Sequence, residues 1–142
     1  MKNWREQYDY VGPFYEGRAV VRLGDSWGHV DREGNVTIPV IYKYVWPFFK
    51  GRARVQLGDK YGHVDKQGRV TTPIEYDYVL PFREGRAKVR LGDKYGHIDK
   101  RGRAKTPIEY DYVGSFSEGR ARVRLCDRYG HVDKNGNEIK EE

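Results

Sequence analysis

The chain has 142 residues, of which 37% are hydrophobic and 34% charged, and its formal net charge is +6. This length suits one ordinary domain, and no stretch approaches the ~20 apolar residues of a membrane-spanning helix. The only cysteine, Cys126, excludes an intrachain disulfide. The N-terminal stretch MKNWREQYDY contains no apolar leader segment. We therefore expect a soluble, cytoplasmic chain that does not associate with membranes.

The sequence repeats itself four times with a period of 34 residues. The clearest motif begins at Gly24 (GDSWGHVDREG), Gly58 (GDKYGHVDKQG), Gly92 (GDKYGHIDKRG) and Cys126 (CDRYGHVDKNG). Units this short bury their hydrophobic faces against neighbouring units, so the repeat determines the architecture. We expect one repeat domain over residues 1–142, with an N-terminal cap at 1–7. Its repeats are expected at about 8–41, 42–75, 76–109 and 110–142.

Alternating polar and apolar residues in each repeat predict a β-hairpin. In the third repeat the run Arg86–Leu91 (RAKVRL) is followed by Gly-Asp and then by Tyr95–Asp99 (YGHID). Period-two alternation is typical of half-buried strands, and the short Gly-Asp connection favours a two-residue loop. This pairing puts two sets of side chains on opposite faces: Val89, Leu91 and Ile98 on one, and Lys88, Arg90, Tyr95 and His97 on the other.

A turn, a third strand and a crossover complete the predicted repeat. The residues DKRG at 99–102 suit a type I turn or a G1 bulge. A short third strand follows, RAKT in this repeat and RVTT from Arg69. Pro73 and Pro107 are expected to end strand pairing, because proline has no amide donor. The stretch PIEYDYV then runs extended to Phe82 or Phe116, and Glu-Gly turns the chain into the next unit.

No helical period appears, so we predict an all-β fold of four tandem 34-residue repeats. Each repeat is expected to form a three-stranded antiparallel meander, and the meanders an open, twisted stack. A closed four-bladed ring like a small propeller is the alternative. The polar segments KNWREQ and GNEIK at the two ends suit either end caps or a strand exchange that closes a ring. The open form is favoured, because 34 residues are few for a four-stranded blade.

Aromatic residues recur once per repeat and are expected to fill the gaps between units. The recurring positions are Tyr8, Tyr42, Tyr76 and Tyr110, and Phe14, Phe48, Phe82 and Phe116. A nearby position varies instead, and holds Gly12, Trp46, Leu80 and Gly114. Such variation is typical of an exposed position, so Trp46 is a candidate contact residue.

One histidine per repeat stands two residues before an aspartate: His29, His63, His97 and His131. A metal site is disfavoured, because equivalent histidines in a continuous meander lie three strands, or about 14 Å, apart. Ligand atoms on one zinc ion lie roughly 3–4 Å apart. Catalysis is disfavoured because no nucleophile recurs beside the histidines. We expect each histidine to cap a polar sheet face and each aspartate to hold its turn. No cofactor is expected, and His63 and His97 remain candidates for partner contact.

The first strand of each repeat carries basic side chains at ten of twelve alternating positions. They are Arg18, Arg22, Arg52, Arg54, Arg86, Lys88, Arg90, Arg120, Arg122 and Arg124. This strand face can be a solvated surface that the four aspartates partly neutralise. With the interleaved aromatic residues it is also a candidate binding surface for an anionic partner.

The stretch PIEYDYVLPFREGRAKVRLGDKYGHIDKRG resembles the bacterial WG repeat, also called the KWG repeat. Shared features are a Pro and a Tyr-Asp pair, a Phe-x-Glu-Gly-x-Ala turn, and an aromatic–Gly pair followed by Ile/Val-Asp. The tryptophan survives only as Trp27, with Tyr61, Tyr95 and Tyr129 in its place, and a histidine follows the glycine in every copy. The resemblance implies a β-rich repeat protein with a binding or scaffolding role and no reaction.

The sequence therefore predicts a non-enzymatic scaffold that mediates protein–protein interaction through its basic, aromatic-rich strand face. The alternative is a module that binds nucleic acid or another anionic polymer, because basic grooves with stacking aromatics suit single strands. The partner is expected to be a protein or another anionic macromolecule, and the oligomeric state stays open.

Overall fold

The computed structural model describes residues 3–140. Contacts between Cα atoms divide the chain into two compact units, Met1–Glu75 and Tyr76–Glu142. This division falls at the predicted boundary between the second and third repeats. The grouping of all four repeats into a single domain stays a prediction.

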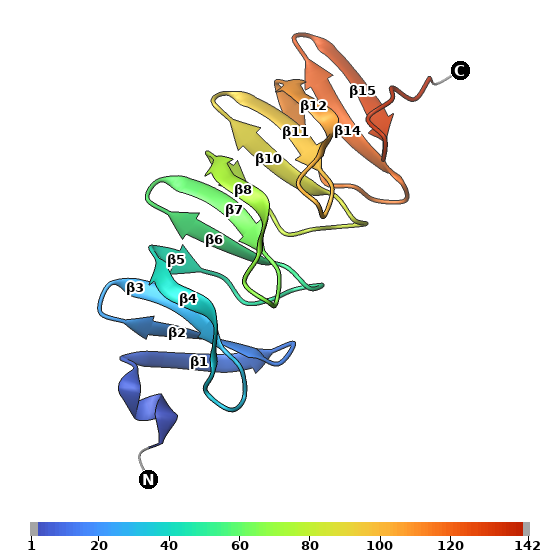
Figure 1. Cartoon of the computed structure of the whole chain (residues 1–142). Helices are drawn as coiled ribbons and strands as arrows, with labels where there is room; N and C mark the ends of the chain where they lie inside the picture. The colour runs from blue at the N-terminus through green and yellow to red at the C-terminus, as the bar shows by residue number, and fades with distance from the viewer. Residues whose placement is uncertain (1–2, 141–142) are drawn as a thin grey trace. The chain divides into compact units, whose positions relative to one another are not determined.

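The first unit begins with a 3-10 helix, η1 (Trp4–Gln7), and continues with two antiparallel sheets (Figure 1). The first sheet consists, in order, of β1 (Tyr10–Tyr15), β2 (Arg18–Leu23), β3 (Ser26–Val30) and β4 (Val36–Tyr42). The second consists of β5 (Tyr44–Val45), β6 (Ala53–Leu57), β7 (Lys60–Val64) and β8 (Val70–Tyr76).

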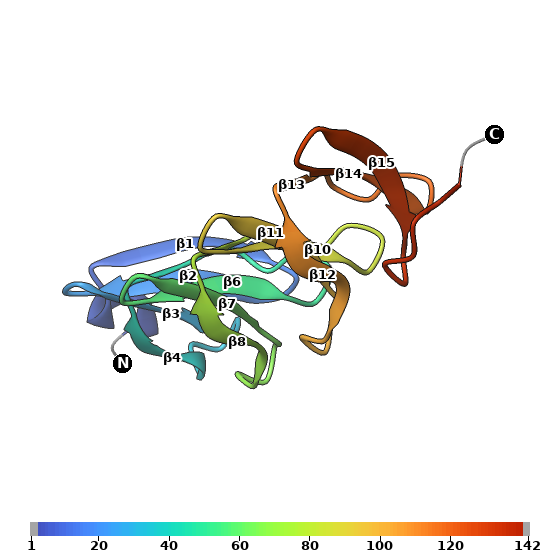
Figure 2. The ribbon, with the colours of Figure 1, turned by 90° about the horizontal axis from the view of Figure 1, so that it is seen from above.

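The second unit repeats this plan with seven strands. One sheet contains β9 (Tyr78–Val79), β10 (Ala87–Leu91), β11 (Lys94–Ile98) and β12 (Ala104–Tyr110). The other contains β13 (Tyr112–Val113), β14 (Arg120–Leu125) and β15 (Arg128–Asp133), with β14 in the middle (Figure 2). Residues 3–140 contain no α-helix, and none of the four sheets is closed. The predicted all-β fold of antiparallel meanders is confirmed, and each of the four sheets is open as expected.

The predicted hairpin register is confirmed in the third repeat. Lys88 pairs with His97 and Leu91 with Lys94, which leaves Gly92 and Asp93 as the two-residue loop. Ala87 and Ile98 pair on the opposite face, where both are buried. The alternation along the sequence therefore assigned the two faces of the hairpin correctly.

The prediction that proline ends strand pairing was wrong. Strand β8 runs through Pro73 and β12 through Pro107. Pairing between β11 and β12 shifts register on either side of His97, so the strand bulges where the proline lacks a donor. The bulge brings Thr106 against the sheet, where its carbonyl oxygen would lie 2.6 Å from a Cβ at Gly96. Only glycine leaves room for it, which explains the aromatic–Gly pair.

A crossover links each sheet to the next sheet of its unit. Only Lys43 separates β4 from β5, and only Asp111 separates β12 from β13. The chain leaves one sheet at the end of its last strand and at once becomes the short outer strand of the next (Figure 1). The predicted combination of a three-stranded meander and an aromatic crossover is confirmed.

The Glu-Gly turns also connect successive repeats. Glu84 and Gly85 both have positive φ, 51° and 77°, as a two-residue type I′ turn requires. The carboxylate of Glu84 accepts hydrogen bonds from the amides of Glu118 and Gly119 at 2.7 and 2.8 Å. In the first unit, Glu16 makes the same contacts with the turn that begins at Lys50.

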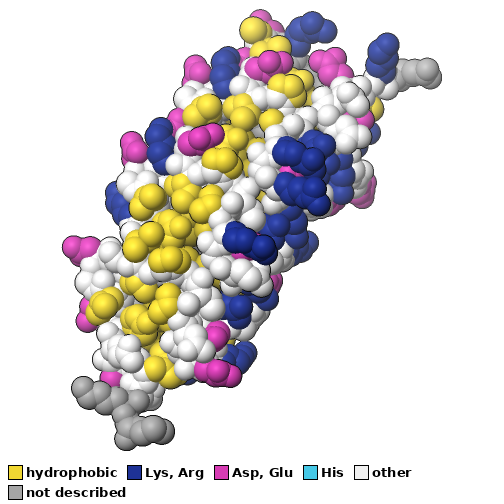
Figure 3. All heavy atoms as spheres, viewed as in Figure 1, with side chains coloured by type: hydrophobic (Ala, Val, Ile, Leu, Met, Phe, Trp, Pro, Cys, Tyr) yellow, Lys and Arg dark blue, Asp and Glu magenta, His cyan; other side chains and the backbone are white. Residues whose placement is uncertain are grey.

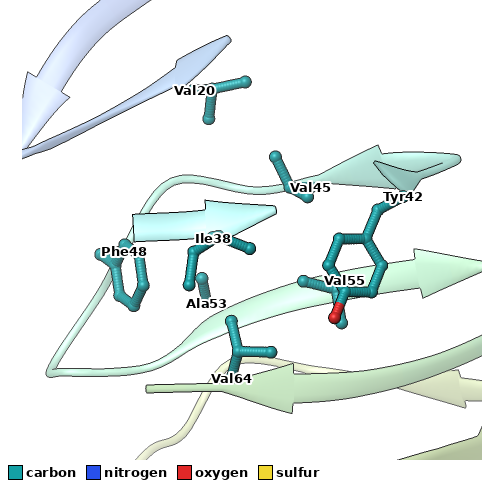
Figure 4. Close-up of a cluster of buried hydrophobic side chains, with 8 residues drawn as sticks. All are labelled: Val20, Ile38, Tyr42, Val45, Phe48, Ala53, Val55 and Val64. Carbon is teal, nitrogen blue, oxygen red and sulfur yellow. The ribbon is translucent and has the colours of Figure 1, made fainter. Parts of the chain in front are cut away.

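One hydrophobic core cluster of the first unit lies between its two sheets (Figure 4). It consists of Val20, Ile38, Tyr42, Val45, Phe48, Ala53, Val55 and Val64. The equivalent cluster of the second unit contains Tyr110, Val113 and Phe116 from the crossover. Tyr42 and Phe48 in the first unit, and Tyr110 and Phe116 in the second, thus fill the gap between the two repeats of their unit, as predicted for these positions. Within residues 3–140 no helix is long and apolar enough to cross a membrane.

Candidate functional site

The histidines of the first three repeats are buried, which contradicts their expected place on a polar outer face. His29, His63 and His97 are at most 1% exposed. The Nε2 atom of His97 lies 2.7 Å from the carbonyl oxygen of Gly114 in the next repeat, and Nδ1 lies 2.9 Å from Oγ1 of Thr106. A carbonyl oxygen only accepts, so Nε2 carries the proton and Nδ1 accepts from the threonine hydroxyl. Burial lowers the pKa of His97 to about 4, which keeps the ring neutral.

His29 makes the same contact between repeats but lacks half of this environment. Its Nε2 atom lies 2.9 Å from the carbonyl oxygen of Trp46, while Nδ1 is buried without a hydrogen-bond partner. Ile38 pairs with His29 at the position where Thr106 pairs with His97, and isoleucine has no hydroxyl to offer. Burial lowers the pKa of His29 to about 4 as well. Among residues 3–140, no three His, Cys, Asp or Glu side chains are grouped so that they could hold a metal ion.

The aspartates hold their turns, as expected. One carboxylate oxygen of Asp99 accepts hydrogen bonds from the amides of Arg101 and Arg103, at 2.9 and 3.0 Å. The other oxygen accepts from Nε of Arg103 at 2.9 Å. These bonds close the DKRG turn that the sequence predicted.

The basic side chains of the first strands are mostly half-buried, and many bind turn carbonyls. Arg18, Arg52 and Arg86 donate to the carbonyl of the preceding glycine at 3.0–3.2 Å. Arg22, Arg90 and Arg124 donate to the hairpin loop two residues ahead at 2.7–3.1 Å. Arg120, also half-buried, pairs in register with Asp133. Most of this row therefore supports the turns at the strand ends.

The middle positions of the basic row lie against aromatic rings instead. The guanidinium of Arg54 sits 4.5 Å from the ring centroid of Trp46. Lys88 lies between Tyr95 and Tyr112, at 5.0 and 4.7 Å from their centroids. Burial lowers the pKa of Lys88. Arg122, at the same position of the last repeat, is exposed.

Five aromatic side chains form a continuous row in the first unit. This aromatic row consists of Tyr10, Trp27, Tyr44, Trp46 and Tyr61. Successive ring centroids lie 4.8–5.9 Å apart, and the rings meet edge-on or tilted. Arg22 also lies over Trp27, at 5.8 Å. Hydrophobic side chains gather on the face of this unit seen in Figure 3.

Only Trp46 of the row was singled out from the sequence, and it is half-buried rather than exposed. The other members occupy two recurring positions, the second tyrosine of Tyr-x-Tyr and the aromatic of the aromatic–Gly pair. Their recurrence was visible, but the sequence did not show that the crossover brings the two positions together. The signal in the sequence is that both positions carry an aromatic residue in every repeat, which marks them as candidates for a shared aromatic surface.

A hollow of about 210 Å³ adjoins the aromatic row at the first repeat. Tyr10, Pro13, Tyr15, Trp27 and Tyr44 contribute to its lining, and Gly12 lies at its base. Gly12 occupies the variable position that holds Trp46 in the second repeat. This position therefore adjoins a hollow in the first repeat and holds a ring in the second, so the two repeats differ in surface shape.

A family model described as "WG containing repeat" matches four consecutive segments, residues 7–27, 27–61, 61–95 and 95–127. The boundaries fall on Trp27, Tyr61 and Tyr95, the aromatic residues that precede the buried glycines. No curated protein matches the chain.

Several solved structures are similar in fold at low identity. The extracellular domain of BT4673 from B. thetaiotaomicron has a TM-score of 0.47 at 12% identity, over 93% of this chain and 22% of that one. A protein of unknown function from Bacteroides caccae gives 0.38 at 13% identity, over 92% and 58%. A symmetrical protein described for its de novo evolutionary emergence gives 0.37 at 10% identity, over 92% and 71%. This chain thus spans about a fifth of the first of these proteins and under two thirds of the second.

The cytoplasmic location expected from the sequence is not retained; the first of these structures is described as an extracellular domain of another protein. That expectation is corrected. It rested on a single cysteine and on the lack of an apolar leader at residues 1–10, and neither observation establishes a cytoplasmic location.

Proposed function

Because the chain belongs to the WG repeat family, we propose that it is a non-enzymatic scaffold that binds a protein partner through the aromatic row of its first unit. The proposal keeps the interaction role expected from the sequence. It moves the contact surface from the whole basic strand face to the rings and to the two arginines, Arg22 and Arg54, that lie on them.

The observation that carries this proposal is the row itself, with cations on two of its rings and a hollow beside it. Trp, Tyr and Arg are the residues that dominate binding energy at protein interfaces, and they are enriched there relative to the remaining surface. Rings that already pack on one another have little rotamer freedom to lose on binding. A preformed row of this composition therefore suits protein recognition.

The ring geometry favours a protein over a single-stranded nucleic acid. Bases stack on open, flat ring faces, whereas Trp27 and Tyr44 meet at an interplanar angle of 64° and Tyr44 and Trp46 at 85°. Arg54 also lies over the face of Trp46. Because the net charge is +6, an anionic polymer is the second candidate partner. The salt dependence of its binding distinguishes it from a protein partner.

The buried histidines support a role without catalysis. His97 uses both ring nitrogens, one toward Thr106 and one toward Gly114. A general base must reach a substrate proton with an available nitrogen. His29 and His97 instead join one repeat to the next through Nε2, and the unbonded Nδ1 of His29 is buried.

The test compares the wild-type chain with Trp46→Leu and Leu57→Ser. Leucine is the residue that the third repeat carries at this position, Leu80, so Trp46→Leu is compatible with the fold. Leu57 is 46% exposed at the hairpin end of the same unit and serves as the matched control. Proteins captured from the source cells on the immobilised wild type are identified, and one of them is purified and titrated with all three chains.

We expect Trp46→Leu to lower the affinity for that partner at least tenfold, as loss of an aromatic hot spot does. Leu57→Ser should bind the partner with the wild-type affinity. Titrations with heparin and single-stranded DNA over a range of salt form the second arm. A partner that binds Trp46→Leu normally contradicts the proposal. Tight polymer binding whose log affinity falls steeply with log salt would favour the anionic-polymer role instead.

A further inference from the structure

An open hollow beside the turn that joins β11 to β12 is lined almost entirely by charged side chains. Its volume of about 520 Å³ lies in the range of small-molecule sites, ~300–1,000 Å³. Besides the carboxylate of Asp99, the lining contains five basic side chains: Arg86, Lys100, Arg101, Arg103 and Lys105. Figure 3 shows Lys and Arg side chains gathered over this turn. We call this site the basic hollow, and a lining of this kind suits an anionic ligand.

The carboxylate of Asp99 is already engaged within the turn. Its side chain is 9% exposed, and one of its oxygens lies 2.9 Å from Nε of Arg103. The other oxygen accepts hydrogen bonds from the amides of Arg101 and Arg103. Five cations and one carboxylate give the lining a formal charge of +4. Like charges gathered around one hollow raise the free energy of the folded chain, and a bound anion would lower it.

The same turn forms in the other repeats without this concentration of charge. The position of Arg101 holds Glu33, Gln67 and Asn135 in the other three copies. In all four copies the amide at this position donates to the aspartate of the turn, at 2.9–3.0 Å. The turn therefore does not require an arginine side chain here.

Lys105 replaces a residue that has a structural role in the first two repeats. In the second repeat the position holds Thr71, whose hydroxyl donates to the carbonyl oxygen of His63 at 3.3 Å. Thr37 makes the equivalent bond in the first repeat at 3.4 Å. The third repeat carries a lysine instead, and its charge adds to the basic hollow. The architecture of the repeat thus explains neither Arg101 nor Lys105, and no other repeat has a basic residue at either position.

The arginines of the basic hollow combine a fixed group with exposed ones. Arg86 donates from Nε to the carbonyl of Lys134 at 2.8 Å and from Nη1 to the carbonyl of Gly85 at 3.0 Å. A side chain held in this way loses little freedom when a ligand binds. Arg101 and Arg103 are exposed to solvent. Their planar guanidinium groups match the oxygens of phosphate in a two-point geometry, and lysines add point charges.

We propose that the basic hollow binds a compact anion that contains two or more linked phosphoryl groups. Each phosphoryl group offers three strong acceptor oxygens, so a linked pair can bridge cations of the turn and of β12. A carboxylate offers only two oxygens. None of the lining residues is aromatic, so the hollow has no ring on which a nucleic-acid base could stack. The site lies in the second unit and is independent of the aromatic row.

Isothermal titration calorimetry of the full chain with pyrophosphate, at constant ionic strength, tests the site. We expect one pyrophosphate per chain, bound more tightly than sulfate. Arg101→Gln combined with Lys105→Thr gives the third repeat the residues of the second, so this variant is compatible with the fold. Its affinity should fall at least about tenfold, because charge-assisted hydrogen bonds are among the strongest.

The control for this loss is Lys43→Gln combined with Arg128→Gln. It removes the same charge at two exposed positions outside the basic hollow, and it should bind pyrophosphate like the wild type. ADP carries the same pair of phosphoryl groups. Its affinity relative to pyrophosphate distinguishes a nucleotide from a free polyphosphate as the source of the ligand.

A transplant into the second repeat is the converse test. This repeat already carries three of the five cations at the equivalent positions, as Arg52, Lys66 and Arg69. Gln67→Arg combined with Thr71→Lys completes the set. The variant should therefore bind two pyrophosphates per chain instead of one.

Three results would each overturn the proposal: pyrophosphate binds no more tightly than sulfate, the Arg101 and Lys105 substitutions leave its affinity unchanged, or the transplant adds no second equivalent. A poly-glutamate peptide or single-stranded DNA that binds more tightly than pyrophosphate at the same salt would also overturn it, and would identify a polymer-binding surface. Trp46→Leu should bind pyrophosphate like the wild type, so the basic hollow and the aromatic row can fail their tests separately.

Discussion

At the scale of single residues, the histidines show what a sequence pattern can and cannot predict. The alternation correctly placed His97 on the face opposite Ile98. It could not show that the crossover of the next repeat covers this face and supplies the carbonyl of Gly114. Burial of a polar ring costs free energy unless both of its nitrogens are hydrogen-bonded. Thr106 provides the hydrogen bond for the second nitrogen, Nδ1. Both partners lie outside the hairpin that carries His97, so their roles follow from tertiary packing.

These histidines predict a stability that falls in mild acid. The pKa values of His29 and His97 are about 4 in the folded chain, against the usual 6.5. Below pH 6.5 the unfolded chain therefore binds more protons than the folded chain. Stability is fully present above about pH 6.5 and is lost progressively toward pH 4, by up to about 3 kcal/mol per histidine.

Urea unfolding at pH 7.0 and pH 5.5 measures this loss. His97→Gln removes one of the two groups, so the difference between the two pH values should be smaller than in the wild type. An unchanged difference would show that His97 does not titrate as its burial requires.

The basic side chains of the first strands were expected on an exposed face because of their residue type, but most of them are half-buried. Arginine stems pack along apolar surface while their head groups reach polar atoms. Arg90 reaches the carbonyl of Gly92 at 2.7 Å, and Arg54 lies on Trp46. The sequence identified the positions of these side chains but not their partners.

At the scale of elements, the strands and turns were predictable because their signals are local. Alternation, Gly-Asp loops and the DKRG turn each act within a few residues, and all three were confirmed in place. The proline was misread because its tolerance depends on a glycine in another strand. Pro107 lies in a bulge that fits only because Gly96 lacks a side chain.

The turn contact of Glu84 predicts a stabilising bond that acid removes. Hydrogen bonds from the amides of Gly119 and Glu118 lower the pKa of Glu84. A lowered folded pKa means that the contribution is present above the usual pKa of 4.5 and is lost as the pH falls through the folded value. Glu84→Gln should therefore lower the melting temperature at pH 7, and the difference should narrow at pH 3.

The matched control for this measurement is Glu118→Gln, at the same turn position of the last repeat. It should melt close to the wild type at pH 7. An equal effect of both substitutions would mean that charge, rather than the bond to the next turn, is responsible.

At the scale of the whole molecule, the 34-residue period was the most informative feature of the sequence. Together with the alternation inside each repeat, it predicted an all-β architecture with open sheets, and both are confirmed. The aromatic row was not predictable, because it joins residues of segments that are far apart in the sequence. Cellular location was not encoded in the features used to infer it.

Deletion of residues 42–75 tests the stacking of open units. The cut joins Ile41 to Tyr76, which is equivalent to Tyr42, so the sequence pattern of β4 is kept. Repeat stability is approximately a sum of unit and nearest-neighbour contributions. The shortened chain should therefore still fold cooperatively, at lower urea concentration and with roughly three-quarters of the wild-type m-value. Circular dichroism without β structure would contradict a stack of separable repeats.

The single-residue links between sheets have a mechanical consequence. Lys43 joins β4 to β5, and Asp111 joins β12 to β13, with no further chain between them. Tension along the chain passes through such a link without slack, so pulling the last strand out of one sheet at once loads the first strand of the next. Each repeat that yields would release 34 residues, or roughly 110–120 Å of extended chain. Within each unit the two repeats thus bear the same tension, one after the other along the chain. At each link the shorter strand, β5 or β13, is the one that detaches from its sheet first.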